Sequence, residues 1–151
     1  NLAWIDATYT TRLVDDGEGG TRDLAGEPTG EPYFSAALGA NYAWLLGTYG
    51  LVDASVTHAY RGESRCNAGS QFQGTCQVSP NFSLGEATNR TDLRLSWVNA
   101  GGRWGVAAFL TNAFDERWAT GVYNLTTSTF GTPFASISEP RMWGVEFSTN
   151  F

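Results

Sequence analysis

The chain has 151 residues, of which 16% are charged and 14% are aromatic, and its formal net charge is −6. Its nine Lys and Arg residues are all arginines, and fifteen acidic residues outnumber them. This balance argues against nucleic-acid binding, because phosphates need clustered basic groups. It also argues against attachment to anionic lipid through a polybasic face.

The first segment alternates between apolar and other side chains, as a strand does. Ala3, Ile5 and Ala7 lie on one face of a strand that we expect over 3–12. An acidic, glycine-containing loop over 14–31 follows. Its carboxylates are Asp15, Asp16, Glu18, Asp23, Glu27 and Glu31. Their spacing matches no EF-hand loop, so a solvated loop is the favoured interpretation, and calcium binding stays open as the alternative.

The longest run without a charge, 32–52, is about the length of a transmembrane helix. Its proline and glycines and the lack of flanking basic residues argue against a helix. Its side chains instead alternate between two faces, which predicts a strand over 33–44 and a short turn over 45–49. The apolar face carries Phe34, Ala36, Leu38, Ala40, Tyr42 and Trp44.

Later segments repeat this alternation, and none shows helical periodicity. They predict strands at 52–61, 92–97, 103–111 and 142–151. The connections alternate in length. Short turns are expected at 45–49 and 99–102, and long polar loops at 14–31, 62–85 and 114–139.

Alternation alone does not separate a soluble sandwich or barrel from a membrane barrel. Strands of about ten residues suit a tilted crossing of the hydrocarbon layer, whereas globular strands are usually nearer five or six. Aromatic residues gather near the strand ends, as in interfacial girdles, and short turns alternate regularly with long loops. We therefore expect an all-β fold: an antiparallel up-and-down transmembrane β-barrel segment of about six strands, in the bacterial outer membrane. The charges expected to face the lumen are Asp92, Arg94, Arg103 and Glu146.

The chain has two cysteines, Cys66 and Cys76, in one predicted loop. In a protein exported through an oxidising compartment, a disulfide between them is the expected interpretation. A metal pair is the alternative, but no His or third Cys lies nearby. The one histidine, His58, is expected to be a structural or interfacial residue on the apolar face. No catalytic elbow or cofactor motif is found, so we expect neither an enzyme nor a bound cofactor.

Several motifs follow one another in a recognisable order. Residues 89–118 combine an alternating strand, a tight glycine-containing turn and a Trp-led strand that runs into Asn-Ala-Phe-Asp at 112–115. A Pro-Arg pair at 140–141 precedes the last strand, which ends in Phe151, and 32–44 is a strand that begins Pro-Tyr-Phe. In this order the motifs resemble the C-terminal strands of the barrel of TonB-dependent outer-membrane receptors, over nearly the whole chain.

The resemblance implies active uptake of a scarce solute, driven by a TonB-type energising complex. It favours a ferric siderophore or related iron complex. Uptake of an oligosaccharide or a cobalamin-like solute, and a passive pore or structural barrel, are the alternatives. The implied partners are outer-membrane lipid, a plug domain and the remaining strands of a barrel of about twenty-two. The plug domain and these strands are absent from 1–151, so we expect a segment of a larger protein, because unpaired edges are unfavourable in lipid.

Phe151 resembles the terminal aromatic that the outer-membrane assembly machinery recognises, although Thr149 stands where a second apolar residue is usual. Selectivity is expected in the long loops, because loops vary without disturbing the scaffold. The candidate ligand-contacting residues there are Arg65, Gln71, Gln73, Arg117, Trp118 and Tyr123. Arginines would suit anionic iron chelates, and the aromatic rings would suit sugars. The alternative is that these loops are only solvated and that the plug binds the solute.

Overall fold

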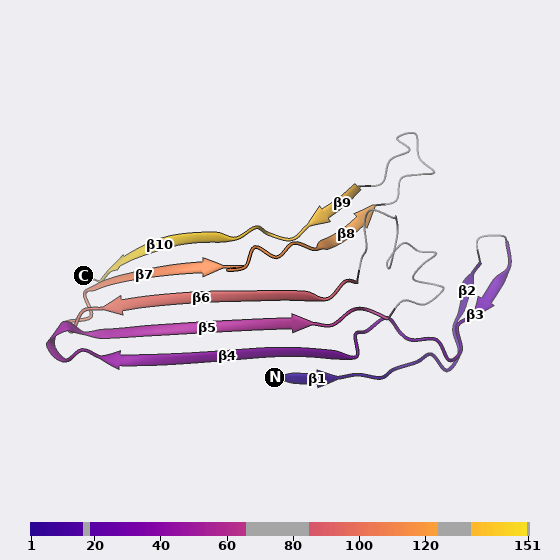
Figure 1. The fold of residues 1–151 in the computed structure, drawn as a ribbon, viewed down its shortest axis with the longest axis horizontal. Helices are drawn as coiled ribbons and strands as arrows, with labels where there is room; N and C mark the ends of the chain where they lie inside the picture. The colour runs from indigo at the N-terminus through magenta and orange to yellow at the C-terminus, as the bar shows by residue number, and fades with distance from the viewer. Residues whose placement is uncertain (17–18, 66–84, 124–133, 151) are drawn as a thin grey trace.

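The computed structural model describes residues 1–16, 19–65, 85–123 and 134–150, and its main body is one antiparallel sheet of six strands (Figure 1). In spatial order these strands are β1 (Leu2–Trp4), β4 (Phe34–Leu45), β5 (Leu51–Arg61), β6 (Thr88–Val98), β7 (Trp104–Thr111) and β10 (Met142–Thr149). Two hairpins stand apart from the sheet. They consist of β2 (Leu13–Asp15) with β3 (Thr21–Asp23), and of β8 (Ala119–Tyr123) with β9 (Phe134–Ile137). The all-β, antiparallel prediction is thus confirmed.

The central strands are long and pair over their whole length. β4 and β5 pair from Ser35 with Arg61 to Leu45 with Leu51, and β5 pairs with β6 over the same span. A strand of 11 residues extends about 36 Å at 3.3 Å per residue. The uncharged run at 32–52 is therefore strand, turn and strand. No helix among the described residues is long and apolar enough to cross a membrane.

Two short turns join the strands at one end of the sheet (Figure 1). The first contains a 3₁₀ turn, η1 (Gly47–Tyr49), and closes at Gly50, whose φ of +106° favours glycine. A Cβ on Gly50 would lie 2.0 Å from the Val98 carbonyl oxygen, so no other residue fits there. In the second turn, the Asn99 side chain accepts a hydrogen bond from the Trp104 N–H at 2.9 Å.

All three long connections begin and end at the opposite end of the sheet (Figure 1). They run from β1 to β4, from β5 to β6 and from β7 to β10, and the first and third contain the two small hairpins. The expected alternation of short turns and long loops is confirmed. The hairpins were not predicted, because their strands are three to five residues long and show no sustained alternation.

The prediction of a ten-residue first strand was wrong. β1 covers only Leu2–Trp4. Two further backbone bonds extend its pairing, from the Ala37 N–H to the Asn1 carbonyl at one end and from the Ile5 N–H to the Tyr33 carbonyl at the other. Beyond it the chain leaves the sheet, and Tyr9 exchanges backbone hydrogen bonds with the turn around Glu27. Most of the alternating residues over 3–12 belong to a segment that hydrogen-bonds to its own loop and not to the sheet. Alternation alone therefore predicted a strand that is too long.

The sheet is a single open layer with almost no core. Among the described residues, the buried apolar ones are Leu24, in the β2–β3 region, Pro32 before β4, and Ala107 in β7. The sheet does not close on itself, because β1 and β10 are edges. No described element covers either face of the sheet, so it does not satisfy the usual requirement that one face pack on a second layer. Burial of its apolar side chains away from water must therefore come from contacts outside the described residues.

Candidate functional site: the two faces of the sheet

The register of the sheet assigns each side chain to one of two faces, because residues directly opposite each other point the same way. One row across five strands is Trp44, Val52, Trp97, Val106 and Phe147. The next rows are Tyr42, Ala54, Leu95, Ala108, Val145 and Ala40, Val56, Leu93, Leu110, Trp143. No member of these three rows is charged. We call this surface the apolar face.

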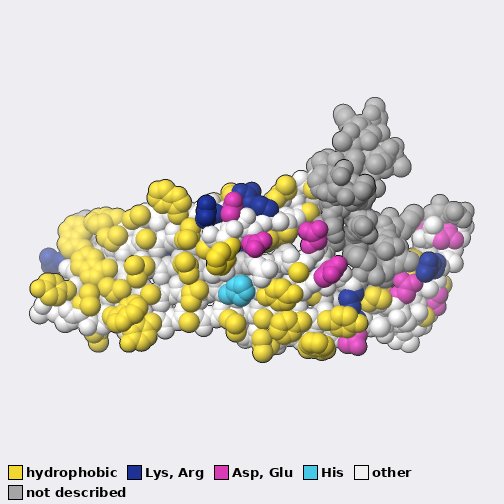
Figure 2. All heavy atoms as spheres, in the orientation of Figure 1, with side chains coloured by type: hydrophobic (Ala, Val, Ile, Leu, Met, Phe, Trp, Pro, Cys, Tyr) yellow, Lys and Arg dark blue, Asp and Glu magenta, His cyan; other side chains and the backbone are white. Residues whose placement is uncertain are grey.

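The apolar face is exposed to an extent that a soluble sheet avoids. The exposed fraction is 54% at Leu95, 65% at Val145 and 67% at Phe147. Soluble monomers rarely expose a contiguous apolar patch beyond a few hundred Å². Apolar side chains cover much of the surface turned toward the viewer in Figure 2. This face therefore needs an apolar covering.

Aromatic rings border the apolar face at both ends. At the loop end, the ring of Phe34 lies between those of Trp4 and Tyr60, with centroids 6.2 and 6.0 Å away. At the turn end, the Trp104 ring lies 5.6 Å from the Phe147 ring. Trp97 also lies there, and its indole N–H donates to the Tyr49 carbonyl at 2.9 Å. Two aromatic borders thus enclose a band that is mostly aliphatic and also contains Tyr42 and Trp143.

The opposite surface, which we call the polar face, carries charged side chains in direct contact. Arg94 of β6 and Glu146 of β10 form an ion pair at 2.5 Å that reaches across β7. On the neighbouring strands, the Asn41 amide donates to the Asp53 carboxylate at 3.0 Å. The remaining residues of this face are mostly small, and one of them, Ala107, is buried opposite Ser96 and Glu146.

A second charged group lies where the polar face meets the loops. The Arg90 Nε donates to both oxygens of Asp92 at 3.1 Å, and its Nη1 lies 3.7 Å from a Glu139 oxygen. Asp92 also accepts the backbone N–H of Asn112 at 2.8 Å. This carboxylate therefore joins β6 to the turn that follows β7.

A hollow of about 350 Å³ opens on the polar face beside the Arg94–Glu146 pair. Its polar lining residues are Ser55, Thr57, Asp92, Arg94, Thr111 and Glu146. Three of the four predicted lumen charges thus lie together. The fourth, Arg103, lies in the turn between β6 and β7, where its carbonyl accepts the Asn150 N–H at 2.9 Å, and it does not join them. Hydroxyl groups beside one arginine and two carboxylates suit a polar solute or a polar protein surface.

The motif at 112–115 builds the point where the chain leaves β7. Asn112 and Asp115 are the only described non-glycine residues with positive φ, at +49° and +55°. The Asn112 amide donates to the carbonyls of Glu116 and Glu139 at 2.9 and 3.0 Å and accepts the Glu116 N–H at 3.0 Å. Asn112 is only 2% exposed. Its side chain thus holds together the two sides of the β7–β10 connection.

Asp115 ties this motif to the Pro-Arg pair. Its carboxylate accepts the Arg141 N–H at 2.8 Å and the Arg117 Nε at 3.1 Å. The Arg141 N–H first, and Arg117 second, hold the pKa of Asp115 below its ordinary value. Two motifs recognised separately in the sequence are therefore parts of one hydrogen-bonded unit, and Arg117 belongs to it.

Arg65, a candidate ligand contact, is engaged within the protein. Its guanidinium donates to Asp6 at 2.8 Å and to the carbonyls of Glu31 and Ala7 at 3.0 and 3.1 Å. It also lies 4.0 Å from the centroid of the Tyr33 ring, and its side chain is 10% exposed. This geometry favours a clamp between the first and second long connections, while ligand contact by Arg65 stays a prediction.

The other predicted loop residues are placed unevenly. Trp118 lines a hollow of about 420 Å³ at the loop end of the sheet, together with Arg61 and Glu86. Tyr123 ends β8, and its ring is outside the described side chains. The residues outside the described ranges are Cys66, Gln71, Gln73, Cys76 and Phe151, so the disulfide and the assembly signal stay predictions. In the part of the chain that the structure describes, no group of three or more His, Cys, Asp or Glu side chains could hold a metal ion.

Sequence reasoning missed one polar pair on the apolar face. His58 of β5 lies directly opposite Thr91 of β6, and its Nδ1 lies 2.9 Å from the Thr91 hydroxyl. The alternation placed His58 on this face, but only the register of the sheet identifies its partner.

The chain was compared with known proteins in three ways. No family model, no curated protein and no solved structure matches it. The two faces, their borders and the loop-end motif are therefore what any functional conclusion must rest on.

Proposed function

We propose that residues 1–151 form the C-terminal wall of an outer-membrane β-barrel that takes up a scarce solute in the manner of TonB-dependent receptors. The observation that carries the proposal is the single-layer sheet with one apolar and one polar face. A covered apolar face and a wet polar face are what a membrane barrel requires. The uptake role is inferred from the resemblance of the sequence motifs to those of TonB-dependent receptors.

The dimensions of the apolar face support membrane insertion. Phe34 and Trp44 stand at opposite aromatic borders on β4 and are ten residues apart. Ten residues extend about 33 Å along a strand. A tilt of about 40° reduces this to about 25 Å, the height of the apolar band in outer-membrane barrels.

The open edges support a larger barrel. In hydrocarbon each unpaired backbone group costs several kcal/mol, so spanning sheets close. β1 and β10 would pair with further strands of the same protein, and the polar face would line the lumen around a plug. A TonB-type complex would drive transport, and the outer-membrane assembly machinery would insert the barrel. No step in this role needs an enzyme activity or a cofactor of these residues.

The solute is proposed from the resemblance, which favours a ferric siderophore or related iron complex over an oligosaccharide or a cobalamin-like solute. The loop end of the sheet is the proposed entry, because all three long connections begin and end there. There Trp118, Arg61 and Glu86 border one hollow. Replacing 66–84 or 124–133 by short Gly-Ser linkers is expected to weaken solute binding. Unchanged affinity after both replacements would assign recognition elsewhere.

Two measurements on the full-length protein test the proposal. It is expected in the outer-membrane fraction, released by detergent and not by high salt or carbonate. Uptake of radiolabelled ferric chelate by cells is expected to stop when the proton-motive force is dissipated, while surface binding continues. Uptake that persists without the proton-motive force would favour a passive pore, and a protein soluble without detergent would contradict membrane insertion.

A further inference from the structure

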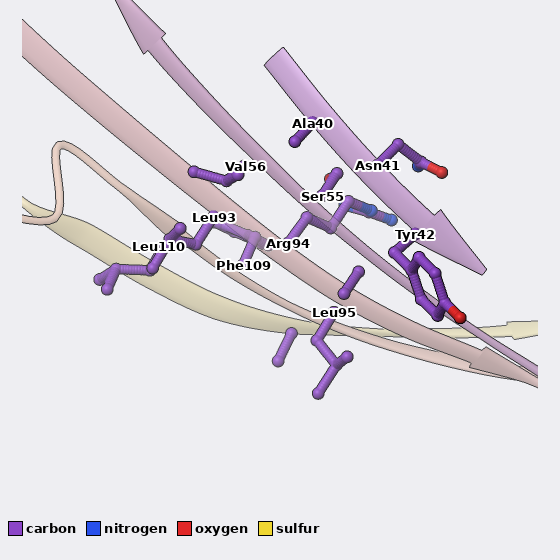
Figure 3. Close-up of a pocket in the computed structure, with 12 residues that line it drawn as sticks. Ala40, Asn41, Tyr42, Ser55, Val56, Leu93, Arg94, Leu95, Phe109 and Leu110 are labelled. Carbon is purple, nitrogen blue, oxygen red and sulfur yellow. The ribbon is translucent and has the colours of Figure 1, made fainter. Parts of the chain in front are cut away.

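The apolar face contains a hollow of about 660 Å³ across β4, β5, β6 and β7 (Figure 3). Three alanines in its lining leave space: Ala40, Ala54 and Ala108. Larger side chains of the same face border it: Tyr42, Val56, Leu93, Leu95 and Leu110. Its volume falls within the range of about 300–1,000 Å³ that is usual for small-molecule sites.

The hollow belongs to the apolar face and not to the polar one. Asn41, Ser55, Arg94 and Phe109 also line it, and they form one row of the sheet whose side chains point to the polar face. By the pleat of the sheet, these four residues contribute backbone to the floor. The space itself is therefore an open hollow bordered by aliphatic groups and one tyrosine.

A polar pair lies in the next row toward the loops. His58 follows Val56 by two residues, about 7 Å along β5, and contacts Thr91 at 2.9 Å. Thr91 is buried, and His58 is partly exposed. Figure 2 shows the imidazole at the surface beside the hydrophobic side chains. Because Nδ1 contacts Thr91, Nε2 is the nitrogen left for a further hydrogen bond.

We propose that the hollow and the His58–Thr91 pair together bind one acylated membrane lipid. Its acyl chain lies in the hollow, and Nε2 of His58 hydrogen-bonds to its ester or amide linkage. The inference rests on the proposed membrane insertion and adds a ligand site outside the solute path.

The polarity and position of the two features fit such an amphiphile. A lipid has an apolar chain below a hydrogen-bonding linkage, and here an apolar hollow lies below a polar pair. His58 also lies two residues before Tyr60, which is at the aromatic border. For a strand tilted by about 40°, the two residues are about 5 Å apart along the membrane normal. Chain linkages lie just inside the headgroup level, so the pair has the appropriate height.

Native mass spectrometry of the delipidated full-length protein in detergent tests the site. A phosphatidylethanolamine with two 16-carbon chains is titrated, and retained lipid is counted. Ala40→Phe fills the hollow, and Ala36→Phe adds the same ring on the same face of β4 outside the lining. We expect about tenfold weaker lipid retention in Ala40→Phe and none of this loss in Ala36→Phe.

His58→Phe tests the polar half of the site. Losing one net hydrogen bond is expected to weaken retention about fivefold. Equal retention in the unaltered protein and in Ala40→Phe would overturn the proposal. A dimer without bound lipid would also overturn the proposal, because it would mean that a second copy of the protein covers the apolar face. If the protein is found in membranes but retains no lipid, only this inference fails. If it is not in membranes, the proposed function fails with it.

Discussion

The Asp115 carboxylate accepts the backbone N–H of Arg141 at 2.8 Å, joining residues 26 apart in the chain. The bond fixes where the chain leaves β7 and where it returns toward β10. It gives a role to the acidic residue that ends the Asn-Ala-Phe-Asp motif. Together with the Asn112 side chain, this carboxylate joins the two ends of a long connection.

This bond makes the loop end sensitive to acid. The pKa of Asp115 is lower in the folded protein than its ordinary value of 3.8, because Arg141 and then Arg117 stabilise the carboxylate. A carboxylate whose pKa is lower in the folded state stabilises the fold at pH values above its unfolded-state pKa. This stabilisation is lost as the pH falls through the folded-state pKa. We therefore expect Asp115→Asn to reduce the urea midpoint in lipid vesicles at neutral pH. The difference from the unaltered protein should disappear at the lowest pH; a difference independent of pH would contradict the assignment.

Asn112→Ala is expected to destabilise the protein by about 3 kcal/mol. The substitution removes three hydrogen bonds at a residue that is 2% exposed and leaves alanine at a φ of +49°. Asn112→Gly keeps the backbone conformation without strain, so its loss should be smaller. Equilibrium urea unfolding in vesicles measures both. Equal losses would mean that the positive φ contributes nothing.

The Arg94–Glu146 pair is expected to behave as one unit across β7. Arg94→Glu and Glu146→Arg alone each place like charges together, and each should lower the thermal midpoint. The double exchange restores opposite charges and should recover much of the loss. Thermal unfolding of the unaltered protein, the two single variants and the double variant measures the interaction between the two side chains. Strictly additive losses would show that the two side chains do not interact.

Much of this arrangement is predictable from sequence, because alternation with period two reports directly on two unlike faces. Leu93, Leu95 and Trp97 against Asp92 and Arg94 predict a strand at 92–97, which lies within β6 but misses its first four residues. Alternation cannot report pairing partners or register, so the His58–Thr91 pair and the reach of Arg94 to Glu146 were beyond prediction. It also cannot distinguish a strand from a segment held by its own loop, which is why the first strand was predicted too long.

The loop residues show a second limit. Arg65 has the charge and the loop position of a ligand contact, yet its partners Asp6, Ala7 and Glu31 come from a distant part of the chain. Similarly, the Asn112 side chain bonds backbone groups, which have no residue-specific signature. Long-range contacts to the backbone leave little trace in a single sequence.

An arginine introduced on either side of β6 should have unequal effects. Leu95→Arg places the charge on the apolar face, where it is expected to cost about 2–4 kcal/mol near the middle of a bilayer. Ser96→Arg points to the polar face and should change the unfolding free energy little. Unfolding in vesicles compares the two. A larger loss of unfolding free energy for Ser96→Arg than for Leu95→Arg would mean that the face of Ser96, and not that of Leu95, is covered by lipid.

The most direct test of membrane insertion is the environment of consecutive residues along β6. Spin labels are placed singly at positions 92 to 97 of the full-length protein in vesicles, in a background in which Cys66 and Cys76 are replaced by serine. Collisions with oxygen, which partitions into lipid, are compared with those of a water-soluble nickel chelate. We predict high oxygen accessibility at 93, 95 and 97 and high nickel accessibility at 92, 94 and 96. Uniform nickel accessibility, or the reversed alternation, would contradict a lipid-covered apolar face.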